Sequence, residues 1–454
     1  MSLERVLIAN RGEIAVRVIR ACKALGIESV IAVSKADTDS RGAQLADRKV
    51  CIGPPRVGES YLNHNAILAA ALGTHSDAIH PGYGFLAENA KFVKACEENG
   101  VTFVGPRSES VAMMGNKLAA REIAKDYGVP VVPGSPKIAR YEEAIKVVEE
   151  IGLPILFKAA AGGGGRGIRI VNEPGELQSA FQSASAEAEA AFGDNTLYLE
   201  RYIVSARHIE IQVFGDKFGN VVHLGERDCS MQRRYQKIIE EAPAVMVPDK
   251  TRQAIRAAAV ALVKGISYEN AGTVEFIYDE ERDEFYFLEM NTRIQVEHPV
   301  TEAVTGIDLV QLQLKVAGDE PLPFAQSDIN FSGHAIECRI NAESPKRSFH
   351  PSPGKITTWR PPEIEGVRLD THCFAGYEVP PFYDSLLAKL IIYGRDRNDA
   401  LERTKEALGQ FQVKGIDTNV EFLSFLVNDP AFESGRYNTR WVEGNIDRFL
   451  PTSA

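Results

Sequence analysis

The chain has 454 residues, enough for two or three domains, and its 44% hydrophobic and 25% charged residues are typical of a soluble globular protein. A net charge of -11 argues against nucleic acid or an anionic membrane as a partner, and no apolar run approaches the roughly 20 residues that span a bilayer. Six scattered cysteines without a CxxC pair, and an N-terminus without the apolar core of a signal peptide, predict a cytoplasmic protein with reduced thiols.

The first elements predict a βαβ unit, and therefore a fold that opens with a parallel sheet. Residues 6–9 form an apolar strand. Residues 13–25 carry apolar side chains at helical spacing and end before Gly26, and residues 29–33 form the next strand. The turn before the helix lacks the GxGxxG pattern, so no dinucleotide site is predicted there.

A glycine-containing loop, residues 81–86, follows a predicted strand at residues 77–80. Ligands of open α/β sheets bind beyond the carboxyl ends of the strands, so the backbone of this loop could approach a ligand and Tyr83 could pack against it. An ordinary tight turn is the alternative interpretation. Residues 103–106 end the first predicted domain.

A compact insert at residues 131–203 follows a predicted helix at residues 117–127. Inside it, the glycine run 162–165 joins two short predicted strands, whereas a P-loop would open a helix. Four glycines are costly to order, so the run indicates a flap whose N–H groups could fold over phosphates. Lys158, just before the flap, could reach a phosphate or could be a solvated surface residue.

The next segments could each be a cleft wall or an ordinary surface. Residues 200–203 end an apolar strand and could present backbone groups to a flat base. His208, Glu210 and Gln212 alternate with apolar residues and share one face. Residues 228–237 mix cations and amides, which near a triphosphate would neutralise the charge that develops in phosphoryl transfer.

Residues 272–278 and 285–288 predict a hairpin around an acidic turn. If the hairpin is centred on Arg282, Glu275 lies opposite Glu289, and two facing carboxylates repel unless a cation lies between them. Oxygen ligands with Asn291 nearby favour Mg²⁺ or Mn²⁺ over Zn²⁺. An exposed acidic hairpin, or a centre displaced by one residue, is the alternative.

Residues 289–300, at the end of this hairpin and directly after it, contain an unusual number of charged and amide side chains. Side chains alternate along a strand, so Glu289 and Asn291 should share a face, together with Arg293 if the strand continues. The third part begins near Ser332. Its first predicted strand places Arg339 on the same face as Glu337, and an ordinary ion pair between the two is the alternative to a functional role for Arg339. Helices are predicted at residues 398–411 and 419–427.

Several long motifs occur in the order found in one enzyme family. These are IANRGEIAVRVIRA (8–21), HPGYGFLAEN (80–89), GGGGRGIR (162–169), ERDCSMQRRYQK (226–237), EMNTRIQVEHPVTE (289–302) and ECRINAE (337–343). The chain resembles biotin carboxylase, the ATP-grasp subunit of biotin-dependent carboxylases, along essentially its whole length. The resemblance implies an α/β and α+β multidomain fold, with a Rossmann-like preATP-grasp domain (1–114), an ATP-grasp domain (115–330) with a mobile lid (about 131–203), and a C-terminal biotin carboxylase domain (331–454).

The resemblance also implies the roles of individual residues. It assigns to the ATP site Lys117, Lys158, Gly164, Gly165, Glu200, Arg201, Tyr202, Ile203, His208, Gln232 and Tyr235. It assigns two divalent cations, Mg²⁺ or Mn²⁺, to Glu275 and Glu289 with Asn291 beside them. Bicarbonate would be held by Lys237, Arg293, Gln295, Val296 and Glu297, and the biotin ureido group would meet Arg339, with Tyr83 nearby.

In such an enzyme Glu297 would deprotonate bicarbonate, which would attack the γ-phosphate of ATP to give carboxyphosphate while Lys237 neutralises charge. The phosphate released with CO₂ would remove the N1′ proton of biotin, and Arg293 and Arg339 would stabilise the enolate-like oxygen. Tyr235 departs from the family pattern, because many relatives carry His there; Arg201 replaces a common Lys and Ala87 a frequent Ser.

The resemblance further implies partners. No Met-Lys-Met-type biotin attachment segment is present, so biotin is expected on a biotin carboxyl carrier protein, and the carboxyltransferase on another subunit. A homodimer is expected. Acetyl-CoA, propionyl-CoA and pyruvate carboxylases all use such a subunit, so the acyl acceptor stays open. The alternatives are another ATP-grasp ligase of the carbamoyl phosphate synthetase type and a silent ATP-binding or assembly subunit.

Overall fold

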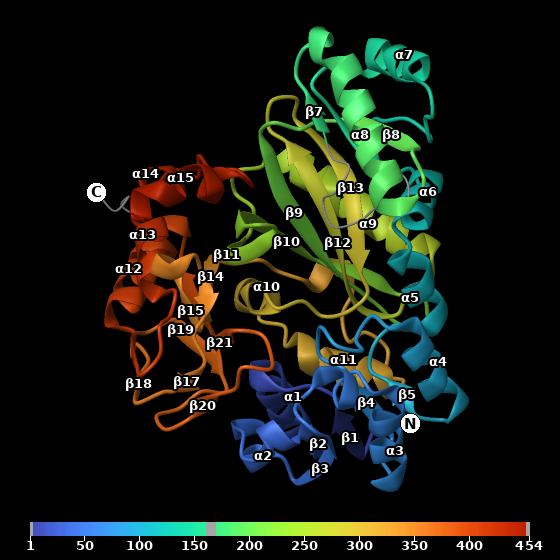
Figure 1. Ribbon diagram of the computed structural model, residues 1–454. Helices are drawn as coiled ribbons and strands as arrows, with labels where there is room; N and C mark the ends of the chain where they lie inside the picture. Colours follow the sequence, from blue (N-terminus) through green and yellow to red (C-terminus); the bar gives the residue numbers. More distant parts are fainter. Residues whose placement is uncertain (1–2, 160–168, 451–454) are drawn as a thin grey trace.

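The computed structural model describes residues 3–159 and 169–450. In Figure 1 the N-terminal part lies at the bottom, the insert at the top, and the C-terminal part to the left of a long central sheet. No helix among the described residues is both long and apolar enough to cross a bilayer.

The N-terminal part contains the predicted parallel sheet, with strand order β3-β2-β1-β4-β5. Its strands are β1 (Arg5–Ile8), β2 (Glu28–Ser34), β3 (Arg48–Gly53), β4 (Ala78–His80) and β5 (Thr102–Phe103). Its helices are α1 (Gly12–Ala24), α2 (Arg41–Leu45), α3 (His64–Gly73), α4 (Ala90–Glu98) and α5 (Ser108–Gly115). Val6 pairs with Ser29 on one side and Ala78 on the other, which confirms the predicted βαβ opening.

The loops that follow β1 and β4 are tied together at the carboxyl edge of this sheet. The Asn10 side-chain amide donates to the carbonyl oxygens of Pro81 and Tyr83, at 2.7 Å each. Gly82 has φ +61°, and a Cβ there would lie 3.0 Å from the side chains of Asn10 and Ile14, so the close approach requires glycine. This packing fixes the position of Tyr83.

An eight-stranded antiparallel sheet runs through the middle of the molecule in the order β13-β12-β9-β10-β11-β14-β21-β19. The strands are β9 (Ala206–Gly215), β10 (Val221–Arg233), β11 (Gln236–Ala242), β12 (Asn270–Asp279), β13 (Glu284–Asn291), β14 (His334–Asn341), β19 (Val367–Thr371) and β21 (Leu386–Gly394). Because β11 pairs with β14, this sheet continues across residue 330, the predicted end of the second domain.

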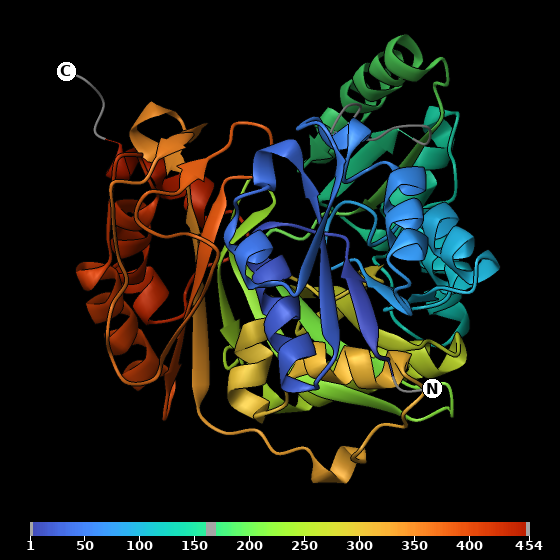
Figure 2. The same cartoon turned by 90° about the horizontal axis from the view of Figure 1, so that it is seen from below.

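Helices cover the sheet and join it to the N-terminal part. They are α9 (Asp249–Gly265), α10 (His298–Thr305) and α11 (Leu309–Ala317). One apolar core contains Ile14 and Val18 of α1 together with Leu309 and Val310 of α11. Figure 2 shows the N-terminal part lying over α11, which α1 contacts. The N-terminal loops are thereby held against the end of the central sheet.

The insert forms a separate small body above the sheet (Figure 1). It contains α7 (Tyr141–Ile151), α8 (Leu177–Phe192) and the three strands β6 (Ile155–Ala159), β7 (Arg169–Val171) and β8 (Leu197–Arg201), and it follows α6 (Lys117–Asp126). Its own core includes Phe157 and Phe181. The glycine run predicted as a flap, with Gly164 and Gly165, lies outside the described residues.

The C-terminal part packs four helices on the end of the central sheet. They are α12 (Arg397–Gln410), α13 (Val420–Val427), α14 (Pro430–Glu433) and α15 (Trp441–Phe449). Three strand pairs complete it: β15 (Glu343–Ser344) with β16 (His350–Pro351), β17 (Gly354–Lys355) with β20 (Glu378–Val379), and β18 (Thr358–Arg360) with β22 (Gln412–Lys414).

His372 makes the stability of this fold depend on pH. Burial against Tyr377 lowers the pKa of His372 from 6.5 to about 3. Below pH 6.5 the unfolded chain takes up a proton that the folded protein does not, so acidification favours unfolding through this group. We expect His372→Phe to reduce the loss of unfolding free energy by about 1.4 kcal/mol per pH unit between pH 6 and pH 4. Urea unfolding of both proteins across that range measures the difference, and equal slopes would contradict it.

Candidate active site

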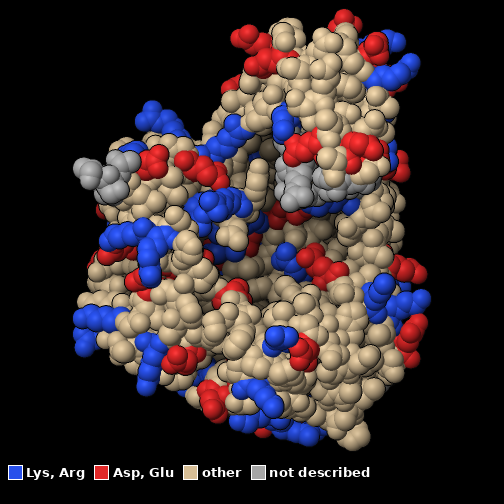
Figure 3. All heavy atoms as spheres, in the orientation of Figure 1, with Lys and Arg blue, Asp and Glu red and all other residues tan. Residues whose placement is uncertain are grey.

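A cavity of about 1540 Å³ lies between the N-terminal loops, the central sheet and the insert. Figure 3 shows the molecule hollowed there, with basic and acidic side chains around the opening. Sixteen of the residues proposed from the sequence line it: Tyr83, Lys117, Lys158, Glu200, His208, Gln232, Tyr235, Lys237, Glu275, Glu289, Asn291, Arg293, Gln295, Val296, Glu297 and Arg339. The fold thus gathers at one cavity residues that lie far apart in the sequence.

Three described residues of the sequence prediction are turned away from this cavity. The Arg201 guanidinium donates to the hydroxyl of Tyr286 (2.9 Å), the Tyr202 ring lies under the Arg440 guanidinium, and Ile203 is buried in an apolar cluster. Arg201, Tyr202 and Ile203 are therefore not among the residues that line the cavity, and the expectation that their backbone groups meet the nucleotide stays a prediction.

The facing carboxylates predicted from the hairpin are present. Glu275 pairs with Glu289 across β12 and β13, and the register shifts by one residue directly after Glu275. Glu275 Oε1 accepts from the amides of Asn291 (2.9 Å) and Gln295 (2.7 Å). Glu289 is only partly buried and accepts from Lys117 Nζ at 2.9 Å. The carboxylates of Glu275 and Glu289 therefore lie next to each other at the cavity, where cationic side chains are close to them.

Lys237 is the centre of the buried charge network. Its Nζ lies 2.5 Å from Glu210, 3.0 Å from Glu275 and 2.6 Å from Glu297. Burial alone would lower the pKa of this ammonium, but the surrounding carboxylates, Glu210 first, raise it well above its ordinary value. Lys237 therefore remains charged, and it holds three carboxylates from three different segments around one point.

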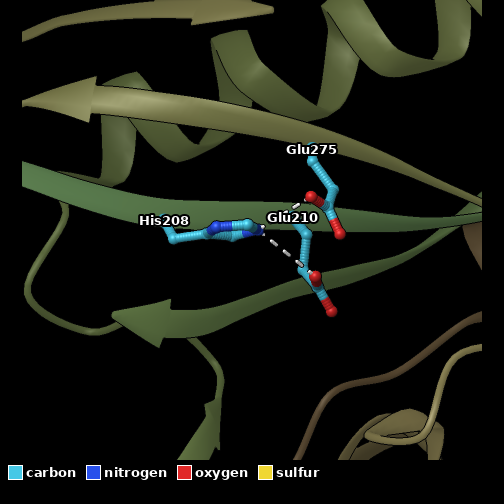
Figure 4. Close-up of side chains that lie close together, drawn as sticks. All are labelled: His208, Glu210 and Glu275. Carbon is cyan, nitrogen blue, oxygen red and sulfur yellow. Dashed lines mark ion pairs between the residues drawn. The ribbon is translucent and has the colours of Figure 1, made fainter. Parts of the chain in front are cut away.

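His208, Glu210 and Glu275 converge from the neighbouring strands β9 and β12 (Figure 4). His208 Nε2 lies 3.1 Å from Glu275 and 3.7 Å from Glu210. Burial opposes protonation, yet the charge of Glu275 helps raise the pKa of His208 to about 9, so the ring is an imidazolium. Glu210 was not assigned a role from the sequence, although its alternation with His208 placed it on the same face.

Glu297 is held between two cations. Lys237 donates to Oε1 and Arg339 Nη2 donates to Oε2 at 2.9 Å. Burial tends to raise the pKa of Glu297, but Lys237 and Arg339 outweigh it, so the pKa is lowered and the carboxylate is ionised. An ionised carboxylate on a cavity wall can act as a general base.

Arg339 lies on the predicted face of its strand, but it does not form the ion pair with Glu337 that the sequence offered as an alternative. Its Nε donates to Glu240 Oε1 at 2.6 Å, and Glu337 is not among its hydrogen-bond partners in the described chain. Burial raises the pKa of Glu240 to about 7. The guanidinium is thus fixed by Glu240 on β11 and Glu297, with part of it toward the cavity.

The segment 293–297 supplies both side chains and backbone. Arg293 Nε donates to Glu88 at 2.8 Å, and its Nη2 donates to the Asn291 side-chain oxygen at 2.8 Å. The carbonyl oxygen of Val296 accepts from Lys389 Nζ at 2.9 Å. Glu88 and Lys389 had no signal in the local sequence, because each reaches the segment from another part of the chain.

The upper end of the cavity, next to the insert, carries lysines. Lys158 Nζ donates to Glu200 at 2.5 Å, and Arg121 pairs with the same carboxylate. Burial would raise the pKa of Glu200, but Lys158 and Arg121 lower it. Tyr235 stands at the turn between β10 and β11 with φ +65° and is 93% exposed, at the cavity edge.

Comparisons with known protein families cover nearly the whole chain. A model described as biotin carboxylase, N-terminal domain, matches residues 2–111, and one described as carbamoyl-phosphate synthase L chain, ATP binding domain, matches residues 116–325. A biotin carboxylase C-terminal domain model matches residues 337–444. The three models follow the order of the parts expected from the sequence.

Individual relatives agree. Biotin carboxylase 1 of Bacillus subtilis (strain 168) is 51% identical over 442 residues, covering 97% of this chain and 98% of the relative. A biotin carboxylase–βγ-ATP complex from Campylobacter jejuni aligns with TM-score 0.89 and 48% identity over 98% of this chain and 99% of that one. The 2-oxoglutarate carboxylase biotin carboxylase domain dimer of Hydrogenobacter thermophilus, with MgADP and bicarbonate, aligns with TM-score 0.88 and 47% identity, covering 99% of each chain.

Proposed function

The chain belongs to the biotin carboxylase family, and we propose that it uses ATP and bicarbonate to carboxylate biotin, forming carboxybiotin, ADP and phosphate. The family establishes the α/β and α+β fold with an ATP-grasp part. The observation that carries the proposal is the position of ionised Glu297 between Lys237 and Arg339, beside the facing carboxylates Glu275 and Glu289.

We assign the first step to the Glu297 end of the cavity. Bicarbonate would lie against Arg293, Gln295 and Val296, where Glu297 removes its proton. The resulting oxygen attacks the γ-phosphorus of ATP in line, ADP departs, and carboxyphosphate forms. Lys237, already charged among three carboxylates, would neutralise the negative charge that grows on the transferred phosphoryl group.

The residues present fit a divalent cation. Glu275 and Glu289 are opposite each other and offer oxygen atoms to the cavity, with the Asn291 side chain beside them. Such hard oxygen donors suit Mg²⁺ or Mn²⁺, and the structure of the Hydrogenobacter thermophilus relative contains MgADP. When bound there, the two expected cations would offset the charge of the nucleotide phosphates.

The second step takes place nearer Arg339. Carboxyphosphate separates into CO₂ and phosphate, and that phosphate accepts the N1′ proton of biotin. The electron pair left on the ureido group attacks CO₂. Arg339, fixed by Glu240 and Glu297, is placed to stabilise the enolate-like oxygen, with Arg293 nearby.

The nucleotide would extend toward the insert. Lys117, Lys158 and His208 supply positive charge along that wall, and Gln232 and Tyr235 lie at its edge. Tyr235 is exposed, so its contact with the nucleotide would be made by a phenol ring and hydroxyl. Because the side chains of Arg201, Tyr202 and Ile203 point away, only their backbone groups are proposed to meet the base.

The wider organisation follows from the family. We propose the division into residues 1–114, 115–330 and 331–454, with residues 131–203 as a lid that excludes water from carboxyphosphate. Biotin would arrive on a carrier protein, with the carboxyltransferase on another subunit, and a dimer is in keeping with the Hydrogenobacter thermophilus relative. The six unpaired cysteines support a location in the cytoplasm.

The function is tested by bicarbonate-dependent ADP release from the purified chain with Mg²⁺, with and without saturating free biotin. Biotin should stimulate release, and Arg339→Ala should lower that stimulation about 10- to 100-fold, because one stabilising cation at the developing oxyanion is lost. ATP binding without any stimulation, by free biotin or by a biotinylated carrier, would favour a silent ATP-binding subunit instead.

Glu289→Gln is expected to raise the Mg²⁺ concentration needed for half-maximal ADP release by about tenfold or more, because the carboxylate charge that attracts the cation is lost while the side-chain size is kept. A Mg²⁺ titration at fixed ATP in excess of its KM measures the shift. A half-maximal Mg²⁺ concentration equal to that of the wild type would remove Glu289 from the metal site.

A further inference from the structure

The site described so far rests on a buried lysine that no catalytic step uses. Lys389 lies in β21 and its side chain is fully buried. Its Nζ donates to the carbonyl oxygen of Val296 at 2.9 Å and lies 3.2 Å from Glu13 Oε1. An unpaired charge at such a site would be very unfavourable, so these two contacts are what hold the ammonium there.

The contacts of Lys389 join three parts of the chain at one point. Glu13 lies in the first turn of α1 in the N-terminal part, Val296 lies in the segment after β13, and Lys389 belongs to the C-terminal part. The Tyr83 hydroxyl donates to the same Glu13 oxygen that faces Lys389. Glu13 and Tyr83 both line the cavity, so the contacts of Lys389 extend to the cavity wall.

Lys389 is also the cross-strand partner of Arg339 in the pairing of β14 with β21. Two cations directly opposite repel unless carboxylates separate their charges. Here Glu13 faces Lys389 at 3.2 Å, whereas Glu240 and Glu297 bind Arg339. Buried Glu337 interacts with the charges of both Lys389 and Arg339, and the repulsion that remains between the two cations favours Arg339 leaning toward Glu297.

We propose that Lys389 is a positioning residue for the biotin end of the site. It fixes the backbone between Gln295 and Glu297 through the Val296 carbonyl, orients Tyr83 through Glu13, and directs Arg339 from the neighbouring strand. The inference rests on the proposed function. It adds that the buried Lys389–Glu13 pair shapes the bicarbonate and biotin end of the cavity while leaving the nucleotide end unaffected.

Three variants separate positioning from support of the fold. Lys389→Met leaves buried Glu13 without the cation it faces, and Glu13→Gln leaves Lys389 with only the charges of Asp370 and Glu337 near it, so each single variant should destabilise the protein. The double variant carries neither charge and should be more stable than either single variant. It still lacks the donor to the Val296 carbonyl, so its kcat/KM for biotin should remain at least about tenfold below that of the wild type, with KM for ATP within about twofold.

The measurements are steady-state kinetics with ATP, bicarbonate and biotin varied in turn, and thermal unfolding of each protein. Arg256→Met is the matched control, because it removes a cation paired with buried Glu226, and neither residue lines the cavity. It should lower stability without changing KM for biotin. The inference is overturned if the double variant regains wild-type kcat/KM for biotin together with its stability, or if KM for ATP rises as much as KM for biotin. Absence of any biotin stimulation in the wild-type protein would instead refute the proposed function.

Discussion

Glu297→Gln should lower the rate of biotin-dependent ADP release by about 10²- to 10⁴-fold, the usual range for loss of a positioned general base. The amide keeps the size of the side chain but cannot accept the bicarbonate proton. Because the charges of Lys237 and Arg339 keep the pKa of Glu297 low, the wild-type carboxylate is already ionised at neutral pH, and the variant cannot be restored by raising the pH.

The measurement is single-turnover formation of carboxybiotin at saturating ATP and bicarbonate. Glu343→Gln is the matched control: its carboxyl also lines the cavity but accepts from Ser385 at 2.6 Å and takes no part in the proposed chemistry. That control should stay near the wild-type rate. A Glu297→Gln enzyme within about threefold of wild type would show that another group is the base.

Lys237→Met should reduce kcat by about 10²- to 10³-fold, the range found when one stabilising donor is removed from a developing anion. The loss has a second component. Without the ammonium, Glu210, Glu275 and Glu297 face one another unshielded, so the pKa of Glu297 rises. The residual activity of the variant should therefore increase with pH through the neutral range, unlike that of the wild type.

The pH dependence of kcat, measured with thermal unfolding at each pH, tests this account of Lys237. Parallel pH profiles for wild type and variant would contradict the proposed coupling to Glu297. A variant that simply fails to fold would be recognised by its unfolding curve. Lys125→Met, which removes a cavity-lining cation paired with Glu122, controls for a general loss of positive charge.

Local patterns were sufficient for part of the site. Strand hydrogen bonding near the hairpin turn pairs Asp279 with Glu284 and Phe276 with Phe287, so the hairpin is not centred on Arg282 as expected. Glu275 faces Glu289, as predicted, only because the register shifts by one residue after Glu275. Strand alternation placed His208 and Glu210 on one face, because it depends on neighbouring residues alone. Alternation along β14 likewise placed Arg339 on the face of Glu337. The one-residue register shift after Glu275 has no local signal, since a bulge depends on how the strand packs.

The long-range contacts could not be predicted in this way. Arg339 pairs with Glu240 and Glu297, rather than with the nearby Glu337, because β11 and the segment after β13 are brought beside it by the folding of the central sheet. Glu13 and Lys389 meet for the same reason. The position of the Arg201 guanidinium likewise depends on Tyr286, a residue on a different sheet.

The most direct test of the proposed function is transfer of isotopically labelled carbon from bicarbonate to a biotinylated carrier protein by the purified chain. Label should appear on the carrier only when ATP and Mg²⁺ are both present, with one ADP released for each carbon transferred, and Glu297→Gln should transfer label at least about 100-fold more slowly. ADP release that proceeds with bicarbonate while the carrier stays unlabelled would contradict the proposed function.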